Sequence, residues 1–253
     1  MVPSRKQPLL SVENLHVQIG KRMILHEISF SVDEGEIIGV IGPNGCGKTT
    51  LLNAISGFLP VDTGTISFRN QDIMHLEPHV RAQLGINRGF QHSGVFREMT
   101  VEDNLILVAE RAPEFPWWWM FSSRLRKRMN SIVENALLGI DLLAHRKSLA
   151  GILSGGQLRL LEIARLQLSK GSLLLIDEPT AGVAPKLKQT LSESIRKLVK
   201  EGGHTAILVE HDLKFLFDIA DRIIVLVDGE KYLEGSPDIV RNDERLRKVY
   251  FGE

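Results

Sequence analysis

The sequence has little cysteine, no excess of charge of either sign and no long apolar run. Its single cysteine, Cys46, excludes an internal disulfide. A low cysteine content of this kind is compatible with a reducing compartment. Lys plus Arg and Asp plus Glu both total 31, so the basic excess typical of nucleic-acid-binding proteins is missing. No run of about 18 apolar residues occurs, so we expect no membrane-spanning helix. With 253 residues, the chain is long enough for one large domain with a subdomain.

A glycine-rich loop lies between the apolar runs 37–41 and 51–55, a setting that predicts a strand, a loop and a helix. Its backbone N–H groups can cradle phosphate oxygens, at the positive end of the following helix. Lys48 adds a positive charge, and the hydroxyl of Thr49 can ligate Mg²⁺. The predicted nucleotide-binding residues of this loop are Gly42, Pro43, Asn44, Gly45, Cys46, Gly47, Lys48, Thr49 and Thr50.

The patterns on either side of this loop predict an α/β protein. Alternating apolar residues indicate strands at 9–17, 28–32 and 64–68, which form an N-terminal antiparallel β portion. From about 101 to 165 helical periodicity prevails, which predicts an inserted helical subdomain. Beyond Lys170, apolar runs alternate with helical segments, which is typical of a mostly parallel sheet with right-handed crossovers.

Polar side chains follow the predicted strands at the edge of the sheet where phosphate would bind. Asp177 and Glu178 end the buried run 173–176; we expect Asp177 to hold Mg²⁺ and Glu178 to polarise the attacking water. His211 follows the strand at 205–209, so it can reach the terminal phosphate from the same edge. Gln91 follows a strand-like segment at 85–88, from which it could orient water or ligate Mg²⁺.

A second helix start with the features of a phosphate site lies far from the first in the sequence. Ser154 and the glycines after it precede the helical run 158–168, so this helix N-terminus could also bind an anion. The residues of this segment are Leu153, Ser154, Gly155, Gly156 and Gln157.

In order and spacing, these motifs resemble the ATP-binding-cassette (ABC) ATPases over nearly the whole chain. The resemblance makes 42–50 the Walker A loop, 173–177 the Walker B strand and 153–157 the LSGGQ signature, which contacts the nucleotide held by a partner cassette. It makes Glu178 the catalytic carboxylate, His211 the switch histidine and Gln91 the glutamine-loop residue. It implies ATP and Mg²⁺ as ligands and a head-to-tail dimer that ATP closes and hydrolysis reopens.

The resemblance also implies how the chain divides into parts. We expect a P-loop NTPase core with the β subdomain at about 1–90 and 170–253, and a helical subdomain with the signature at about 91–169. These parts together form a single ABC nucleotide-binding domain over 1–253.

Two positions depart from the family pattern. Ile19 stands near the place of the aromatic residue that usually stacks on adenine, and it offers apolar contact without π-stacking. Ala184 replaces an aspartate that often bridges the two cassettes. The first change predicts either weaker adenine binding or another residue in the stacking role. The second predicts altered communication across the dimer, particularly with a partner cassette that differs from this chain.

Local stretches narrow the branch of the family. The segments 96–105, 180–183, 209–212 and 249–253 look like those of ATPases that serve branched-chain amino-acid uptake, a pattern shared by urea-uptake and lipopolysaccharide-export ATPases. This resemblance implies transmembrane permeases, a second ABC ATPase in a heterodimer or a homodimer and, indirectly, a substrate-binding protein as partners. It implies no nucleic acid, and a peripheral position on the cytoplasmic face of the inner (plasma) membrane. The alternative is a lipopolysaccharide-export-type or other ABC ATPase, or a soluble ABC regulator without a transport role.

Two further segments give expectations that the structure can test. All three tryptophans lie at 117–119, just before the basic run 124–128, and two interpretations remain open. One is a membrane-interface or partner-docking patch; the other is a loop with a small local core and a solvated basic helix face. Cys46 lies near a helix N-terminus, which favours thiolate and predicts ATP-protected inactivation by alkylating reagents.

Overall fold

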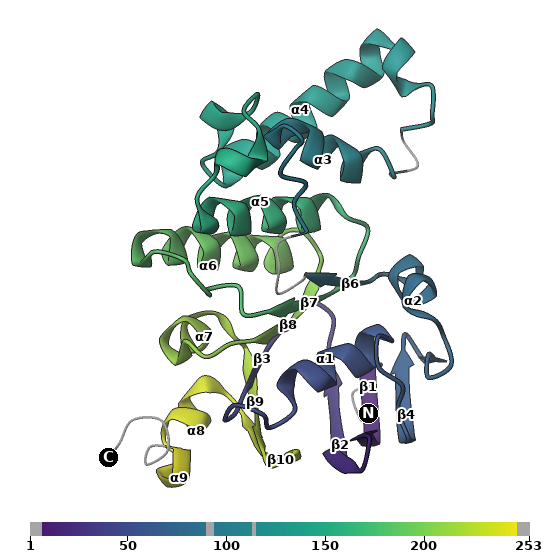
Figure 1. Cartoon of the computed structure of the whole chain (residues 1–253), viewed down its shortest axis with the longest axis vertical. Coiled ribbons are helices and arrows are strands. Elements are labelled where there is room, and N and C mark those ends of the chain that lie inside the picture. The colour runs from purple at the N-terminus through teal and green to yellow at the C-terminus, as the bar shows by residue number, and fades with distance from the viewer. Residues whose placement is uncertain (1–6, 90–93, 113–114, 247–253) are drawn as a thin grey trace, which may run out of the picture. The chain divides into compact units, whose positions relative to one another are not determined.

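The computed structural model describes residues 7–89, 94–112 and 115–246 (Figure 1). The chain forms two compact units. Unit 1 comprises Met1–Arg88, Ser172–Glu178 and Gly203–Glu253, and unit 2 comprises Gly89–Gly171 and Pro179–Gly202. Residues 179–202 therefore fall in unit 2, whereas the sequence patterns had placed them with the ATPase core.

The larger sheet has six strands in the order β10-β9-β3-β8-β7-β6. In chain order, these strands are β3 (Ile37–Ile41), β6 (Ile86–Gly89), β7 (Leu173–Asp177), β8 (Thr205–Val209), β9 (Arg222–Val227) and β10 (Glu230–Gly235). Parallel pairing joins β7 to β8, β8 to β3 and β3 to β9, while β10 is antiparallel to β9. Every residue of β3, β7 and β8 is buried, as expected for strands covered on both faces. The predicted α/β fold with a mostly parallel sheet is confirmed.

The second sheet of unit 1 is antiparallel, as predicted. It has the order β2-β1-β4-β5, with bounds β1 Leu10–Ile19, β2 Arg22–Val32, β4 Thr63–Phe68 and β5 Gln71–Asp72. Helix α1 (Lys48–Ser56) shares one hydrophobic core with inward-facing residues of both sheets. Unit 1 also contains the short helices α2 (Pro78–Leu84), α7 (Leu213–Ile219), α8 (Pro237–Arg241) and α9 (Glu244–Leu246).

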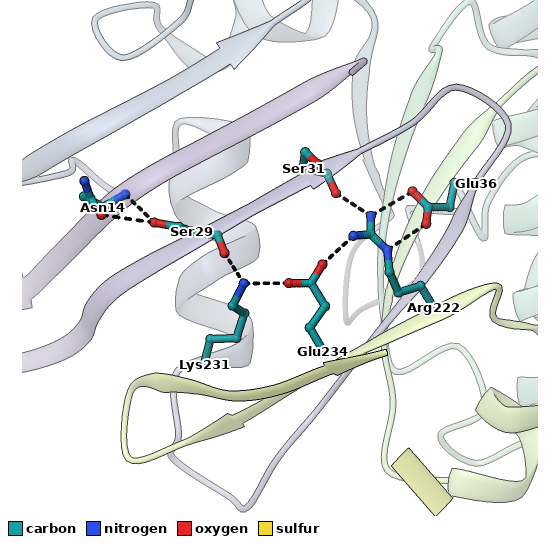
Figure 2. Close-up of polar contacts among 7 residues, drawn as sticks. All are labelled: Asn14, Ser29, Ser31, Glu36, Arg222, Lys231 and Glu234. Carbon is teal, nitrogen blue, oxygen red and sulfur yellow. Dashed lines mark hydrogen bonds and ion pairs between the residues drawn. The ribbon is translucent and has the colours of Figure 1, made fainter. Parts of the chain in front are cut away.

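A polar network fastens β2 to β9 and β10 (Figure 2). Arg222 donates to both carboxylate oxygens of Glu36, at 2.8 and 3.0 Å, and to the carbonyl of Ser31 at 2.5 Å. Its remaining nitrogen pairs with Glu234, which Lys231 contacts at 2.6 Å. Burial alone would lower the pKa of Arg222, but hydrogen bonding and charge from Glu36, with the charge of Glu234, raise it above its ordinary value. This guanidinium therefore stays charged and holds the two sheets together at any working pH.

Four helices make up most of unit 2: α3 (Val101–Ala109), α4 (Ser123–Gly139), α5 (Gly155–Leu168) and α6 (Pro185–Lys200). Helix α5 packs against the other three, and Figure 1 shows it running beside α6. Short 3-10 turns lie at Trp119–Phe121, Leu143–His145 and Ala150–Ile152. Among the described residues, no helix has both the length and the apolar character needed to cross a bilayer.

A buried carboxylate anchors the start of α3. Glu102 accepts a hydrogen bond from Arg146 Nε at 2.6 Å and forms an ion pair with Lys147. Its backbone N–H also donates to the carbonyl of Arg146, at 3.0 Å. Burial would raise the pKa of Glu102, but hydrogen bonds and charges from these two cations bring it below its ordinary value. The ion pairs thus join two segments that are distant in the sequence.

We expect Glu102→Gln to lower the free energy of unfolding by about 1–3 kcal/mol at neutral pH, because two cations lose a buried partner. Since the folded-state pKa lies below the ordinary 4.5, the ionised carboxylate stabilises the fold fully above that pH. This contribution disappears as pH falls through the folded-state pKa, so the difference between wild type and variant should shrink in acid. Urea unfolding at several pH values measures this difference in the free energy of unfolding, and Glu98→Gln, at an exposed position, is the control. A difference that does not change with pH would contradict the assignment.

Candidate functional site

The phosphate loop connects β3 to α1 and requires glycine at two places. Gly47 stands at the N-cap of α1 with φ 105°, a conformation that L side chains rarely adopt. A Cβ at Gly47 would also lie 2.5 Å from Leu25 Cδ2. At Gly42, a Cβ would lie 2.2 Å from the carbonyl oxygen of Leu226. The strands β2 and β9 therefore leave room only for glycine, and the backbone can turn its N–H groups toward an anion.

Lys48 lies over this loop with its side chain buried. Its Nζ donates to the carbonyl oxygens of Gly42 at 2.7 Å and Pro43 at 3.0 Å. An ammonium group has three donors and no acceptor, so these contacts fix the charge close to the loop. The position suits electrostatic recognition of phosphate.

Cys46 is buried within the same loop, with Lys48 Nζ 4.0 Å from its sulfur. Burial raises the pKa of the Cys46 thiol above its ordinary value, and the nearby Lys48 charge only partly opposes this. The sequence-based expectation of a thiolate is therefore wrong. Burial also outweighs the hydrogen bonds that the backbone N–H groups of Lys48 and Cys46 provide at this helix N-terminus.

We accordingly expect maleimide to modify Cys46 at least about tenfold more slowly in the folded protein than in the unfolded chain at neutral pH, since the thiolate is the reactive form. Because it is the only cysteine, mass spectrometry of the intact chain measures the rate directly. Labelling in 6 M urea is the reference. Equal rates in the two states would show that the thiol is accessible and ionised.

Asp177 is the last residue of β7, and only one oxygen of its buried carboxylate has a partner among the described residues. Its Oδ2 lies 3.4 Å from Arg88 Nη2, but Oδ1 has no hydrogen-bond partner among the described residues. Burial raises the pKa of Asp177 and the charge of Glu178 adds to this, while Arg88 and a hydrogen bond with Thr49 oppose it. A carboxylate oxygen without a partner, beside a hydroxyl at the end of the phosphate loop, fits a hard divalent cation such as Mg²⁺.

Glu178 and His211 meet at the ends of β7 and β8. The two strands are parallel with Asp177 beside Val209, so the residues that follow them emerge at the same edge. His211 Nε2 lies 3.0 Å from Glu178 Oε1. Glu178 adopts φ 49°, and its N–H donates to the carbonyl of Val209 at 2.9 Å. The backbone thus turns sharply after Asp177, and the Glu178 carboxylate faces the neighbouring strand end.

Local hydrogen bonds also hold the backbone around His211. The buried carboxylate of Glu210 accepts from the N–H groups of His211 and Asp212, at 3.0 and 3.3 Å. Asp212 in turn caps α7 by accepting from the N–H of Phe215 at 3.1 Å. The histidine is therefore carried by a rigid turn between a buried strand and a capped helix.

The segment Leu153–Gln157 belongs to unit 2, whereas the phosphate loop and the strand-end residues belong to unit 1. Ser154 Oγ accepts from the N–H of Gln157 at 3.3 Å, and Gln157 Oε1 accepts from the N–H of Ser154 at 2.9 Å. This capping box fixes the first turn of α5. A Cβ at Gly156 would lie 2.7 Å from Leu187 Cδ1, so glycine allows the close approach of α6.

Three other predicted positions have different outcomes. Gln91 lies outside the described residues. Ile19, at the end of β1, is half exposed. Ala184 is the N-cap of α6 and makes no side-chain capping bond, so this helix starts on Pro185 without the support that an aspartate would give.

Arg88 is the site residue that the sequence analysis missed. It extends from β6 toward Asp177 and also hydrogen-bonds the side chains of Asn53 and Ser56 on α1. Burial lowers the pKa of Arg88, and the charge of Asp177 counteracts this. The only signal was a basic residue inside a strand-like run, which does not reveal its partner in a sequence.

Comparison with known proteins identifies the family to which these motifs belong. A family model described as "ABC transporter" matches residues 25–181, more than half of the chain. The chain belongs to the ABC transporter family. With its phosphate loop and strand-end carboxylates, it is an ABC ATPase that binds nucleotide.

Relatives of this ABC ATPase match it almost from end to end. It is 36% identical over 255 residues to the high-affinity branched-chain amino acid transport ATP-binding protein LivG of Salmonella typhimurium, covering 98% of this chain and 99% of LivG. It is 33% identical over 252 residues to BraF of Pseudomonas aeruginosa, which has the same description and similar coverage, 98% and 99%.

A solved structure of the family is also similar. It is the ADP conformation of MJ1267, an ATP-binding cassette of an ABC transporter, with a TM-score of 0.81 and 33% identity over 98% of this chain and 100% of that one.

Proposed function

We propose that this ABC ATPase energises the uptake of branched-chain amino acids. The observation that carries the proposal is its end-to-end similarity to LivG and BraF, both described as branched-chain amino acid transport ATP-binding proteins. This chain also carries motifs in the order of the ABC family, with carboxylates and a histidine at the strand ends. The cargo itself is selected by other subunits, because an ABC ATPase supplies the driving force and not the recognition site.

The roles that we propose within unit 1 follow from the positions of its side chains. The loop 42–50 binds the ATP phosphates through its backbone N–H groups and Lys48. Thr49 and Asp177 hold Mg²⁺, and for Gln91 the same role rests on the family resemblance alone. When bound, this ion neutralises charge on the phosphate oxygens. Asp177 Oδ1, buried without a partner among the described residues, supports this assignment.

Glu178 orients and polarises the water that attacks the terminal phosphate, and it accepts the proton that the water loses. His211, 3.0 Å from the Glu178 carboxylate, holds this group in place and reaches the terminal phosphate with the same ring. The protein itself contributes little covalent chemistry, because catalysis of phosphoryl transfer depends on positioning the reactants and stabilising charge.

We further propose that two cassettes clasp ATP between them. The segment Leu153–Gln157 of one contacts the nucleotide on the loop of the other, and the rigid first turn of α5 supports such a role. ATP then closes the dimer and hydrolysis reopens it. In the uptake systems that this chain resembles, two different ATPase subunits commonly pair, so we propose a heterodimer beneath two permeases, on the cytoplasmic face of the inner membrane. A substrate-binding protein delivers the cargo to the permeases.

Purification of the tagged chain from membranes in mild detergent, followed by mass spectrometry, tests this assembly. The proposal predicts recovery of two permease-like chains and a second ABC ATPase, with an untagged strain as control. Recovery of the tagged chain alone, or with lipopolysaccharide-export subunits, would overturn the proposed uptake function.

A further inference from the structure

The segment before α4 exposes several large apolar side chains, although one of its tryptophans is buried. Trp117 and Phe121 are 83% and 81% exposed, and Trp118 and Met120 are about half exposed. Trp119 is buried instead, and its ring meets that of Phe115 edge to face at 6.0 Å. The local core of the second interpretation is present at Trp119, whereas Trp117 and Trp118 face outward and the membrane or docking interpretation stays a prediction.

Hydrogen bonds hold these exposed rings in a defined turn. The N–H of Trp119 donates to the carbonyl of Pro116 at 2.8 Å, and the N–H of Phe121 donates to that of Trp118 at 3.0 Å. The N–H of Ser122 donates to the Trp119 carbonyl at 3.1 Å, immediately before α4 begins. The exposure thus belongs to an ordered turn, and large ordered apolar surfaces commonly mark sites of contact.

Positive charge lies next to these aromatics. Residues 115–133 contain four basic and no acidic side chains, although the whole chain has a net charge of zero. The four basic residues, Arg124, Arg126, Lys127 and Arg128, are all exposed on the first turns of α4. We call these four cations with Trp117, Trp118, Met120 and Phe121 the aromatic-basic patch.

These cations occupy the less favourable end of their helix. A helix N-terminus carries partial positive charge and is stabilised by acidic residues, yet the first turn of α4 has none. Arg124 lies in that turn, and Arg126 follows just beyond it. An anionic partner would relieve this repulsion, and side-chain contacts within the described part of the chain offer no equivalent compensation for the four cations.

We propose that the aromatic-basic patch is a lipid-contact site that binds the surface of an anionic phospholipid membrane. Tryptophan and phenylalanine rings settle at the boundary between headgroups and acyl chains, while Arg and Lys pair with lipid phosphates. The contact gives the cassette a membrane attachment of its own, separate from any permease. It goes beyond the proposed function and does not depend on the cargo.

Intrinsic fluorescence tests the contact directly, because all three tryptophans of the chain lie within or beside the patch. The purified full chain is titrated with vesicles of phosphatidylcholine containing about 30% phosphatidylglycerol, and with pure phosphatidylcholine vesicles as reference. We expect the emission maximum to move to shorter wavelength with anionic vesicles only, and the shift to disappear in high salt. No shift, or an equal shift with neutral vesicles, would overturn the proposal.

Co-sedimentation with the same vesicles measures the affinity in matched variants. Arg124→Gln/Lys127→Gln should weaken partitioning by about 30-fold, since each cation near an anionic surface contributes about fivefold. Arg196→Gln/Lys197→Gln removes the same charge from an exposed part of α6 and should bind like wild type. Equal binding by the two double variants would overturn the assignment to this patch.

A second pair of variants tests the aromatic side chains. Trp117→Ser/Phe121→Ser should reduce partitioning by about tenfold, because binding grows with the apolar area that enters the interface. Leu138→Ser/Ile239→Ser, at positions 57% and 56% exposed, is the matched control. If patch variants bind vesicles normally but lose co-purification with permeases, the patch is a protein-docking surface and the lipid proposal fails.

Discussion

Glu178→Gln is expected to slow ATP hydrolysis by about 10²–10⁴-fold, the usual contribution of a general base, with little change in ATP affinity. Glutamine keeps the length of the side chain and an oxygen that can accept from His211 Nε2, which lies 3.0 Å from the present carboxylate. It cannot accept the proton of the attacking water. The substitution therefore separates chemistry from binding.

Phosphate release and ATP binding are measured on the same preparation of the Glu178→Gln variant. Glu201→Gln, an exposed position at the end of α6, is the control and should hydrolyse ATP like wild type. Hydrolysis by Glu178→Gln within about threefold of wild type would remove Glu178 from the catalytic role, because loss of a general base costs far more. A parallel loss of ATP affinity would instead indicate that the strand end had collapsed.

Lys48→Met is expected to weaken ATP binding by about 10- to 150-fold, the range for loss of one hydrogen bond to a charged group, and to abolish detectable hydrolysis. Methionine has a similar length but no charge and no donor. The substitution also removes Lys48 Nζ, which donates to the carbonyl oxygens of Gly42 at 2.7 Å and Pro43 at 3.0 Å. We therefore expect some loss of folding stability in the variant.

Calorimetric titration with ATP measures the affinity of Lys48→Met, and thermal unfolding shows that the variant is folded. Lys214→Met, at an exposed position on α7, is the matched control. Unchanged ATP affinity in a folded Lys48→Met protein would place the nucleotide elsewhere.

Local and periodic features made the central part of the fold predictable. The fully buried strands β3, β7 and β8 appear as short apolar runs, and glycines mark the phosphate loop between β3 and α1. Strand β10 was missed because Glu230–Gly235 is mostly polar and lies at the sheet edge, where burial imposes no alternation. Helix α2 was missed because seven residues give too few turns for a clear period.

The sequence indicated that the candidate site residues lie at the strand ends, but it did not indicate most of their contacts. Parallel pairing of β7 and β8 made it predictable that Glu178 and His211 would share one edge, but the φ of 49° at Glu178 has no sequence signal. The Arg88–Asp177 contact joins residues far apart in the chain, so only the fold reveals it. The pKa of Cys46 could not be judged either, because it depends on burial by neighbouring elements.

The most direct test is uptake of radiolabelled leucine by cells that lack the chromosomal gene and carry a plasmid copy. The account predicts that the wild-type chain restores ATP-dependent uptake, while Glu178→Gln reaches the membrane at equal level and restores none. Uptake supported equally by Glu178→Gln, or no dependence of uptake on the gene, would contradict the conclusion that ATP hydrolysis at this site energises the import of branched-chain amino acids.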